Sequence, residues 1–138
     1  MTSDDYKLTA TDYENLLAFR TGLRVFLRWS ESQARAAGLT PAQHQLLLAV
    51  RGNRGGGPPT VGEIASALLL RHHSTVELID RAEAAGLVRR YRDGADARMI
   101  RIRLTPEGER RLARLSAAHL DELRRLAPML EHLVIGEP

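Results

Sequence analysis

The sequence predicts a mostly α-helical fold that carries one small β-hairpin. Apolar residues recur at helical spacing along most of the chain, threonine-based capping signals mark where helices begin, and one later stretch alternates between apolar and basic residues. A length of 138 residues is enough for one hydrophobic core, and an aromatic content of only 4% makes that core mainly aliphatic.

Four threonines mark the predicted helix starts. Three of them stand three residues before a glutamate or glutamine, so that both side chains satisfy backbone amides of the first turn. The fourth precedes a proline, which is favoured at the first helical position. These threonines are Thr11, Thr40, Thr60 and Thr105.

Two glycines, Gly38 and Gly86, follow apolar helical patterns and supply C-terminal stops. The glycine-rich residues 51–59 predict a mobile connector, and no Gly-Lys-Ser/Thr follows that would make them a phosphate-binding loop. The predicted helices span residues 11–37, 41–51, 61–68, 72–85 and 106–127, with a short last helix after Pro128.

After the last of these stops the apolar spacing changes from helical to alternating. Ile100, Ile102 and Leu104 alternate with arginines, which predicts a strand with one apolar and one cationic face. A basic run at residues 88–92 precedes it, and an Asp-Gly turn at 93–94 joins the two runs. Helices followed by a basic hairpin indicate a winged helix-turn-helix.

Charge divides the chain into three parts. Residues 40–105 carry ten arginines against six acidic residues, whereas residues 1–39 carry five basic and five acidic side chains and residues 106–138 carry five and six. This distribution is typical of a protein whose central part meets a polyanion. We therefore predict a DNA-binding domain at 40–105, an N-terminal dimerisation helix at 1–39, and C-terminal dimerisation helices at 106–138.

Several classes of function are not expected. The absence of cysteine excludes disulfides, thiolate metal sites and cysteine redox sensing. The five histidines show no i, i+4 pair, and no nucleophile–base pair or convergent carboxylates stand out, so we expect neither a metal, nor a cofactor, nor an enzyme. No apolar run has the length of a membrane span and the N-terminus lacks the order of a signal peptide, which predicts a cytoplasmic protein without membrane contact.

The helix predicted at 72–85 has the features of a recognition helix, because its first turn is polar and its back is apolar. In a helix-turn-helix the N-terminal residues of the second helix meet base edges in the major groove. Arg71, His72 and His73 can donate to guanine or to phosphates, and Ser74 can bond any base. Two alternatives remain for the next positions. Either Val76 is exposed toward a thymine methyl and Thr75 is buried, or the reverse holds.

The chain resembles the MarR family of bacterial transcriptional regulators over nearly its whole length. The resemblance lies in "LTPAQHQLLLAV", "TVGEIASALLL", "TVELIDRAEAAGLVRR" and above all "DGADARMIRIRLTPEG". The last stretch matches the wing pattern of the family at Asp96, Arg98, Leu104, Thr105 and Gly108.

The resemblance implies that Arg98 enters the minor groove and that Asp96 orients it; the alternative is that the two residues only pin the turn. Narrow minor grooves attract arginine through their negative potential. The remaining basic side chains of the domain are predicted to contact phosphates. They are Arg81, Arg89, Arg90, Arg92, Arg101 and Arg103.

The resemblance further implies a homodimeric repressor. Apolar residues in both terminal segments exceed what a monomer of this size can bury, so these helices are expected to interleave between two subunits. A two-fold dimer would bind a pseudo-palindromic operator of double-stranded DNA with half-sites about 10 bp apart. The alternatives are a winged-helix protein-interaction module and a non-specific architectural DNA binder.

A small aromatic or anionic effector is also expected from the resemblance, where the dimerisation helices meet the DNA-binding domain. Arg28, Trp29, His44 and His119 are the candidate ligands for it. The competing interpretations are that Trp29 only packs in the core or interface, and that His119 is an ordinary buried histidine with satisfied hydrogen bonds.

Overall fold

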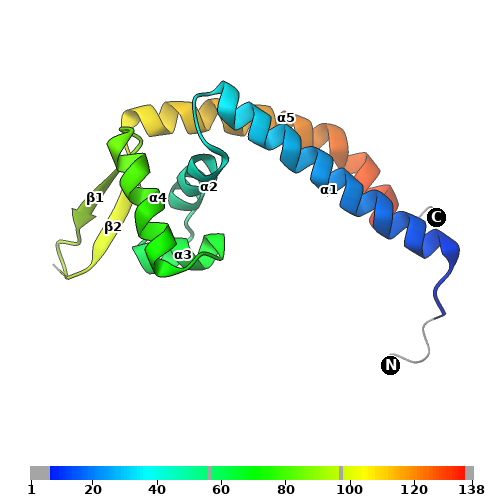
Figure 1. Cartoon of the computed structure of the whole chain (residues 1–138), viewed down its shortest axis with the longest axis horizontal. Coiled ribbons are helices and arrows are strands. Elements are labelled where there is room, and N and C mark those ends of the chain that lie inside the picture. Colours follow the sequence, from blue (N-terminus) through cyan, green and yellow to red (C-terminus); the bar gives the residue numbers. More distant parts are fainter. Residues whose placement is uncertain (1–6, 56, 97, 136–138) are drawn as a thin grey trace.

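The computed structural model describes residues 7–55, 57–96 and 98–135, and it confirms the predicted fold class. Two long helices, α1 and α5, lie side by side as an arm, and three shorter helices with a hairpin form a lobe below one end of that arm (Figure 1). The elements are α1 (Ala10–Ala36), α2 (Pro41–Arg51), α3 (Val61–Leu68), α4 (His72–Ala84), β1 (Val88–Arg92), β2 (Ile100–Leu104) and α5 (Pro106–Ile135). No helix in the described part of the chain is long and apolar enough to cross a membrane.

The predicted start of the first helix is wrong by two residues. Thr9, not Thr11, is the N-cap of α1, because its hydroxyl accepts from the amide of Asp12 at 3.2 Å and the Asp12 carboxylate accepts from the Thr9 amide at 2.8 Å. An aspartate at the third position closes this box as glutamate would. Thr11 therefore lies inside the helix.

The other three predicted starts are confirmed. Thr40 and Thr60 each form a reciprocal capping box, with Gln43 and Glu63 respectively. Thr105 caps α5, since its hydroxyl accepts from the amide of Gly108 at 3.0 Å. The helices also stop near the predicted glycines, where Gly38 and Gly86 have φ values of +76° and +75° that favour glycine.

The predicted break at Pro128 is also wrong, because α5 continues through it to Ile135. Proline removes the hydrogen bond to the carbonyl four residues earlier. Leu126 before the proline, and Leu130 and Leu133 after it, are all partly buried, so one packed face runs across the proline. Burial on both sides keeps the segment helical although one backbone bond is missing.

The hydrophobic core lies in the lobe. Residues from α2, α3, α4, the start of β1 and β2 fill it, and α1 and α5 reach it only through Ala34, Leu112 and Leu115. None of the described α1 residues before Ala34, and none of the described α5 side chains after Leu115, is fully buried. The arm thus lacks a core of its own within this single chain.

The hairpin is antiparallel, with Val88 opposite Leu104 and Arg92 opposite Ile100. Ile102 is fully buried as predicted, but Ile100 is 38% exposed because the hairpin extends beyond the core at that end. The preceding connector is fastened where it meets the sheet, since the amide of Ile102 donates to the carbonyl of Pro59 at 2.9 Å. Its last residue is therefore tied to the sheet by a backbone hydrogen bond, and the mobility expected of the connector from its composition stays a prediction.

Leu69, between α3 and α4, should limit stability. Its backbone is left-handed, with φ 55° and ψ 41°, and its side chain is 93% exposed, so no burial offsets the strain. We expect Leu69→Gly to raise the free energy of unfolding by about 0.5–1 kcal/mol, because the relief of backbone strain exceeds the entropic cost of glycine. Chemical denaturation would measure this change. Leu70→Gly is the control: the backbone of Leu70 does not have a positive φ, so glycine there should lower the free energy of unfolding.

Candidate DNA-binding interface

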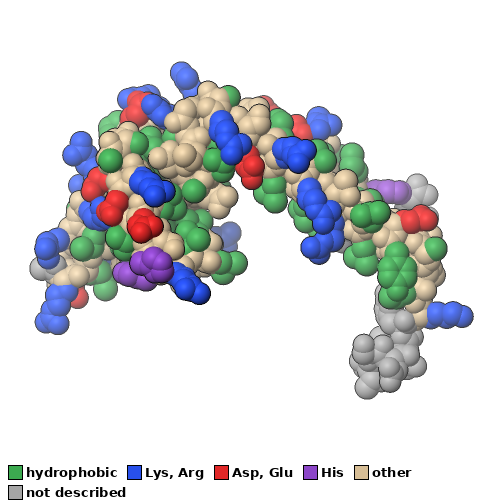
Figure 2. All heavy atoms as spheres, viewed as in Figure 1, with side chains coloured by type: hydrophobic (Ala, Val, Ile, Leu, Met, Phe, Trp, Pro, Cys, Tyr) green, Lys and Arg blue, Asp and Glu red, His purple; other side chains and the backbone are tan. Residues whose placement is uncertain are grey.

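The first turn of α4 is an exposed, polar surface. Arg71, His72 and His73 are all exposed, and the Arg71 side chain makes no capping hydrogen bond although Arg71 is the N-cap residue. Figure 2 shows histidine and arginine side chains together at the lower edge of the lobe. The amides of a helix N-terminus add partial positive charge, so this surface favours an anionic partner.

Thr75 is the buried member of the pair that the sequence left open. It is completely buried, and its hydroxyl donates to the carbonyl of Arg71 at 2.9 Å. Val76 is only partly buried, and it lines a groove next to the hairpin. Ser74 is partly buried beside the exposed histidines. The arrangement leaves Val76, not Thr75, available to a partner.

A groove of about 490 Å³ separates α4 from the hairpin. It combines apolar side chains with basic ones, so it could receive the sugars and phosphates of a nucleic-acid backbone. Met99 and Ile100 form part of its wall but were not predicted as site residues. Their position next to the Asp-Gly turn, where the core cannot cover an apolar side chain, is the sequence signal that could have identified them. The lining residues are Thr60, Val61, Gly62, His72, Val76, Arg90, Asp96, Arg98, Met99 and Ile100.

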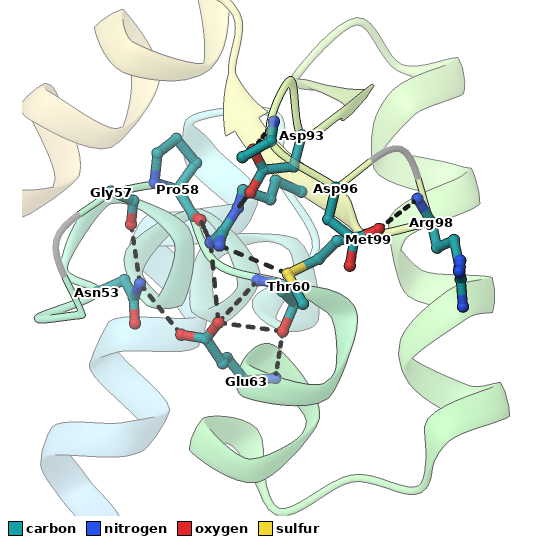
Figure 3. Close-up of polar contacts among 11 residues, drawn as sticks. Asn53, Gly57, Pro58, Thr60, Glu63, Asp93, Asp96, Arg98 and Met99 are labelled. Atoms are coloured by element: carbon teal, nitrogen blue, oxygen red, sulfur yellow. Dashed lines mark hydrogen bonds and ion pairs between the residues drawn. The ribbon is translucent and has the colours of Figure 1, made fainter.

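Arg98 also lines this groove, and its guanidinium has no ion-pair partner within the described ranges. Among the described residues, Asp96 makes hydrogen bonds to two backbone amides: its carboxylate accepts from the amide of Arg98 at 3.0 Å, and its carbonyl accepts from the amide of Met99 at 3.0 Å. Figure 3 shows the Arg98 side chain pointing away from Asp96. Asp96 therefore holds the turn, while the Arg98 guanidinium remains open to a partner.

Comparison with known proteins identifies this architecture. Residues 37–99 match the sequence model described as the MarR family. These residues form a MarR-family domain. A regulator of Bacillus subtilis, named uncharacterized HTH-type transcriptional regulator YsmB, is 40% identical over 68 residues, which are 49% of this chain and 47% of YsmB. The chain thus matches about half the length of that curated relative.

Solved structures extend the MarR-type likeness over most of the chain. A MarR family protein from Bacillus stearothermophilus is 26% identical, with a TM-score of 0.71 over 87% of this chain and 83% of that one. MepR of Staphylococcus aureus, solved as a DNA complex, is 21% identical, with a TM-score of 0.69 over 90% of this chain and 86% of that one. The second likeness concerns the fold alone.

Within the lobe, two of the arginines predicted to contact phosphates, Arg90 and Arg101, are engaged in internal contacts. Arg90 pairs with Asp80 and, at 2.9 Å, with Glu83. Arg101 pairs with Asp93 at 2.9 Å. A phosphate would have to compete with these carboxylates for either side chain.

The other predicted arginines lie on the surface of the domain. Arg103 stacks on the ring of Tyr91, 4.5 Å from its centroid. Arg81, Arg89 and Arg92 are exposed. The role of all these side chains as phosphate contacts stays a prediction.

Three of the four residues predicted to bind an effector lie close together where the arm joins the lobe. The His119 ring of α5 lies 4.8 Å from the rings of both Trp29 and His44, measured between centroids. Phe26, which the sequence did not place here, adds an edge contact to His119 at 6.0 Å. Arg28 is exposed, and among the described residues it takes no part in the ring contacts of this group. The cluster joins α1, α2 and α5.

The hydrogen bonds of His119 determine its tautomer. Nδ1 lies 2.7 Å from the carbonyl of Leu115, which can only accept, so Nδ1 carries a proton. Nε2 lies 2.7 Å from the hydroxyl of Ser30 and accepts from it when the ring is neutral. Both ring nitrogens are thus satisfied, as the sequence interpretation of a satisfied histidine requires.

His44 should make the domain sensitive to acid. Burial, and secondly the charge of the nearby His119, lower the pKa of His44 below its ordinary value of 6.5. As the pH falls, the unfolded chain therefore binds a proton at His44 before the folded chain does. The contribution of neutral His44 to the free energy of unfolding is present above pH 6.5 and is lost as the pH drops toward the lowered pKa. Thermal unfolding at pH 7.5 and pH 5.5 measures this loss.

The matched variants are His44→Gln and His73→Gln. The first should reduce the loss of melting temperature between the two pH values, whereas the second alters an exposed histidine and should leave it unchanged. An equal loss in wild type and His44→Gln would contradict the assignment to His44.

Proposed function

We propose that the chain is a sequence-specific regulator that binds double-stranded DNA as a homodimer. One observation carries this proposal: the exposed polar turn of α4 and the exposed Arg98 border the same groove, so one ligand can meet both. A duplex has the required form, since a helix fits the major groove and an arginine fits the adjacent minor groove. The MepR complex supports this use of the fold.

The proposed DNA contacts fall into two groups. In this proposal the base edges are met by the N-cap and first turns of α4, namely Arg71, His72, His73, Ser74 and Val76. The phosphates are met by the exposed Arg81 of α4 and by Arg89 and Arg92 of β1. Direct base contacts carry sequence information, whereas phosphate contacts supply affinity that depends on salt. Specificity should therefore change most with the first group.

Dimerisation through the arm is supported by its exposed apolar side chains. Hydrophobic residues that are 40–65% exposed gather on α1 and α5, where the single chain has no core. A second copy would cover them, and the two-fold axis would give two recognition helices for a pseudo-palindrome. The residues are Tyr13, Leu16, Leu17, Leu23, Val25, Leu27, Leu120, Leu123 and Met129.

Repression, and its release by a small aromatic or anionic effector, are proposed from the family resemblance. Between α1 and α5 a groove of about 740 Å³ has mainly apolar walls that include Phe26 and Met129. Of the four residues assigned to the effector from the sequence, Trp29 alone lines this groove. Trp29 is therefore the residue to follow by fluorescence when candidate effectors are added.

The first experiment is the selection of binding sites from random duplex DNA, followed by the affinity of the selected site against salt. We expect an inverted repeat with half-sites about one helical turn apart and a steep salt dependence. Arg98→Ala should weaken binding at least about tenfold. Arg124→Ala, on the exposed surface of the arm, is the matched control and should bind as wild type.

Two other outcomes would replace the proposal. A steep salt dependence without an enriched sequence would indicate a non-specific architectural protein. No DNA binding at all would indicate that the winged helix serves protein contacts, and Arg98 would then have no role in DNA binding.

A further inference from the structure

The Arg101 side chain connects three segments that are distant in sequence. Its Nε donates to the carboxylate of Asp93 in the hairpin turn at 2.9 Å, and its Nη1 donates to the carbonyl of Pro58 in the connector at 2.8 Å. The same Nη1 lies 4.0 Å from the carboxylate of Glu63 on α3. Figure 3 shows these three groups converging between the hairpin and α3.

Each acidic partner of Arg101 also organises its own segment. The Asp93 carboxylate accepts from the amide of Ala95 at 3.0 Å and so shapes the hairpin turn. The Glu63 carboxylate accepts from the hydroxyl of Thr60 at 3.1 Å and belongs to the capping box of α3. Arg101 thus joins the turn that carries Arg98 to the first helix of the helix-turn-helix.

The outer end of the hairpin lies beyond the hydrophobic core, and nearer the core Arg90 of β1 pairs with Asp80 and Glu83 of α4. An isolated two-stranded ribbon is marginal in water, and on this one Ile100 is already 38% exposed. The nearest backbone anchor is the hydrogen bond from Ile102 to Pro59, deeper in the lobe. The side chain of Arg101 is only 27% exposed, whereas an arginine that binds a phosphate of DNA needs its guanidinium accessible.

We propose that Arg101 is a positioning residue that locks the wing against α3, and that it supports DNA binding through Arg98 and not by its own contact with DNA. This proposal rests on the proposed function, and for Arg101 it is the alternative to the phosphate contact expected from the sequence. The position of the hairpin turn then depends on the contacts of Arg101 to Asp93 and Pro58, in addition to the ion pairs that join Arg90 of β1 to α4.

Two variants separate positioning from contact. Arg101→Gln should weaken affinity for the selected site about tenfold in the wild-type background, but less than about twofold when Arg98→Ala is already present. A direct phosphate contact would instead weaken binding to a similar degree in both backgrounds and lower the salt slope by about one in the Arg98→Ala background. Arg103→Gln, on the same strand, is the matched control and should act independently of Arg98.

Asp93→Asn is a second test, because the two interpretations of Arg101 predict opposite changes in DNA affinity. It keeps the oxygen that accepts from Ala95 but removes the negative charge that holds Arg101. Positioning predicts weaker DNA binding, whereas a phosphate contact predicts equal or stronger binding, because a negative charge near DNA disappears and Arg101 is released. Equal or stronger binding would overturn the proposal.

Hydrogen exchange without DNA keeps the two proposals distinguishable. In Arg101→Gln the amides of Ala95 and Arg98, which donate to aspartates of the turn, should exchange at least about tenfold faster, while Leu47 in the core stays protected. Unchanged exchange at the turn would overturn the wing lock. If the wild type selects no DNA, the proposed function fails, and this measurement still decides whether Arg101 holds the wing.

Discussion

Gly108→Ala should destabilise the protein by roughly 2–4 kcal/mol, because the start of α5 is pressed against the backbone of another segment. A Cβ at Gly108 would lie 2.2 Å from the carbonyl oxygen of Leu87, which is backbone and cannot rotate away. The same carbonyl accepts from the amide of Thr105 at 3.0 Å, and the Thr105 hydroxyl donates to the carbonyl of Gly86 at 2.6 Å. Moving the helix to admit a methyl group would stretch these bonds.

Gly62→Ala is the matched control, since it makes the same change in the first turn of α3. There the nearest atom to an added Cβ is the Thr60 hydroxyl at 4.0 Å, so alanine fits and should stabilise by up to about 1 kcal/mol through its helix propensity. Chemical denaturation of both variants at one protein concentration measures the difference. Equal stability of the two variants would show that α5 can shift away from Leu87 at no cost.

The helix starts were predictable because capping is a local interaction between residues three apart. Thr40, Thr60 and Thr105 were recognised from their neighbours alone. Thr9 was missed because Asp12, not Glu14, completes the box, although aspartate at that position is shorter and still reaches the N-cap amide at 2.8 Å. The competing signals lay two residues apart, and only the geometry of the first turn distinguishes them.

Features that depend on distant segments were not predictable in the same way. The helical stripe that runs across Pro128 is kept by burial on both of its sides. The hydroxyl of Thr75 is satisfied by a carbonyl of its own helix, so a polar side chain could be buried and Val76 left at the surface. Neither outcome follows from residue type.

The basic residues of the hairpin show the same limit. Alternation along the strand correctly placed Arg101 and Arg103 on the face opposite Ile102. Alternation carries no information on what covers that face, and Arg101 meets Pro58, 43 residues away in sequence. The charge count alone therefore does not distinguish Arg101, which is bonded to distant segments of the chain, from the exposed Arg98.

Replacing Leu120 and Leu123 together by glutamate should yield a monomer and weaken operator binding by at least about 100-fold. In the single chain these leucines are 51% and 43% exposed, so glutamates there can remain hydrated and the lobe should fold as before. In the proposed dimer they face the second copy, where an unpaired charge is costly. Losing the second recognition helix removes the advantage of a bivalent contact.

Sedimentation would show the change directly, from twice the chain mass of 15.3 kDa to that mass itself. Arg124→Glu is the matched control, because it adds a negative charge on the same turn of α5, where the native side chain is 75% exposed. It should remain dimeric and bind the operator within a few-fold of wild type. A double variant that stays dimeric would place the interface elsewhere on the arm, and a monomer that keeps full affinity would mean that one lobe reads the operator alone.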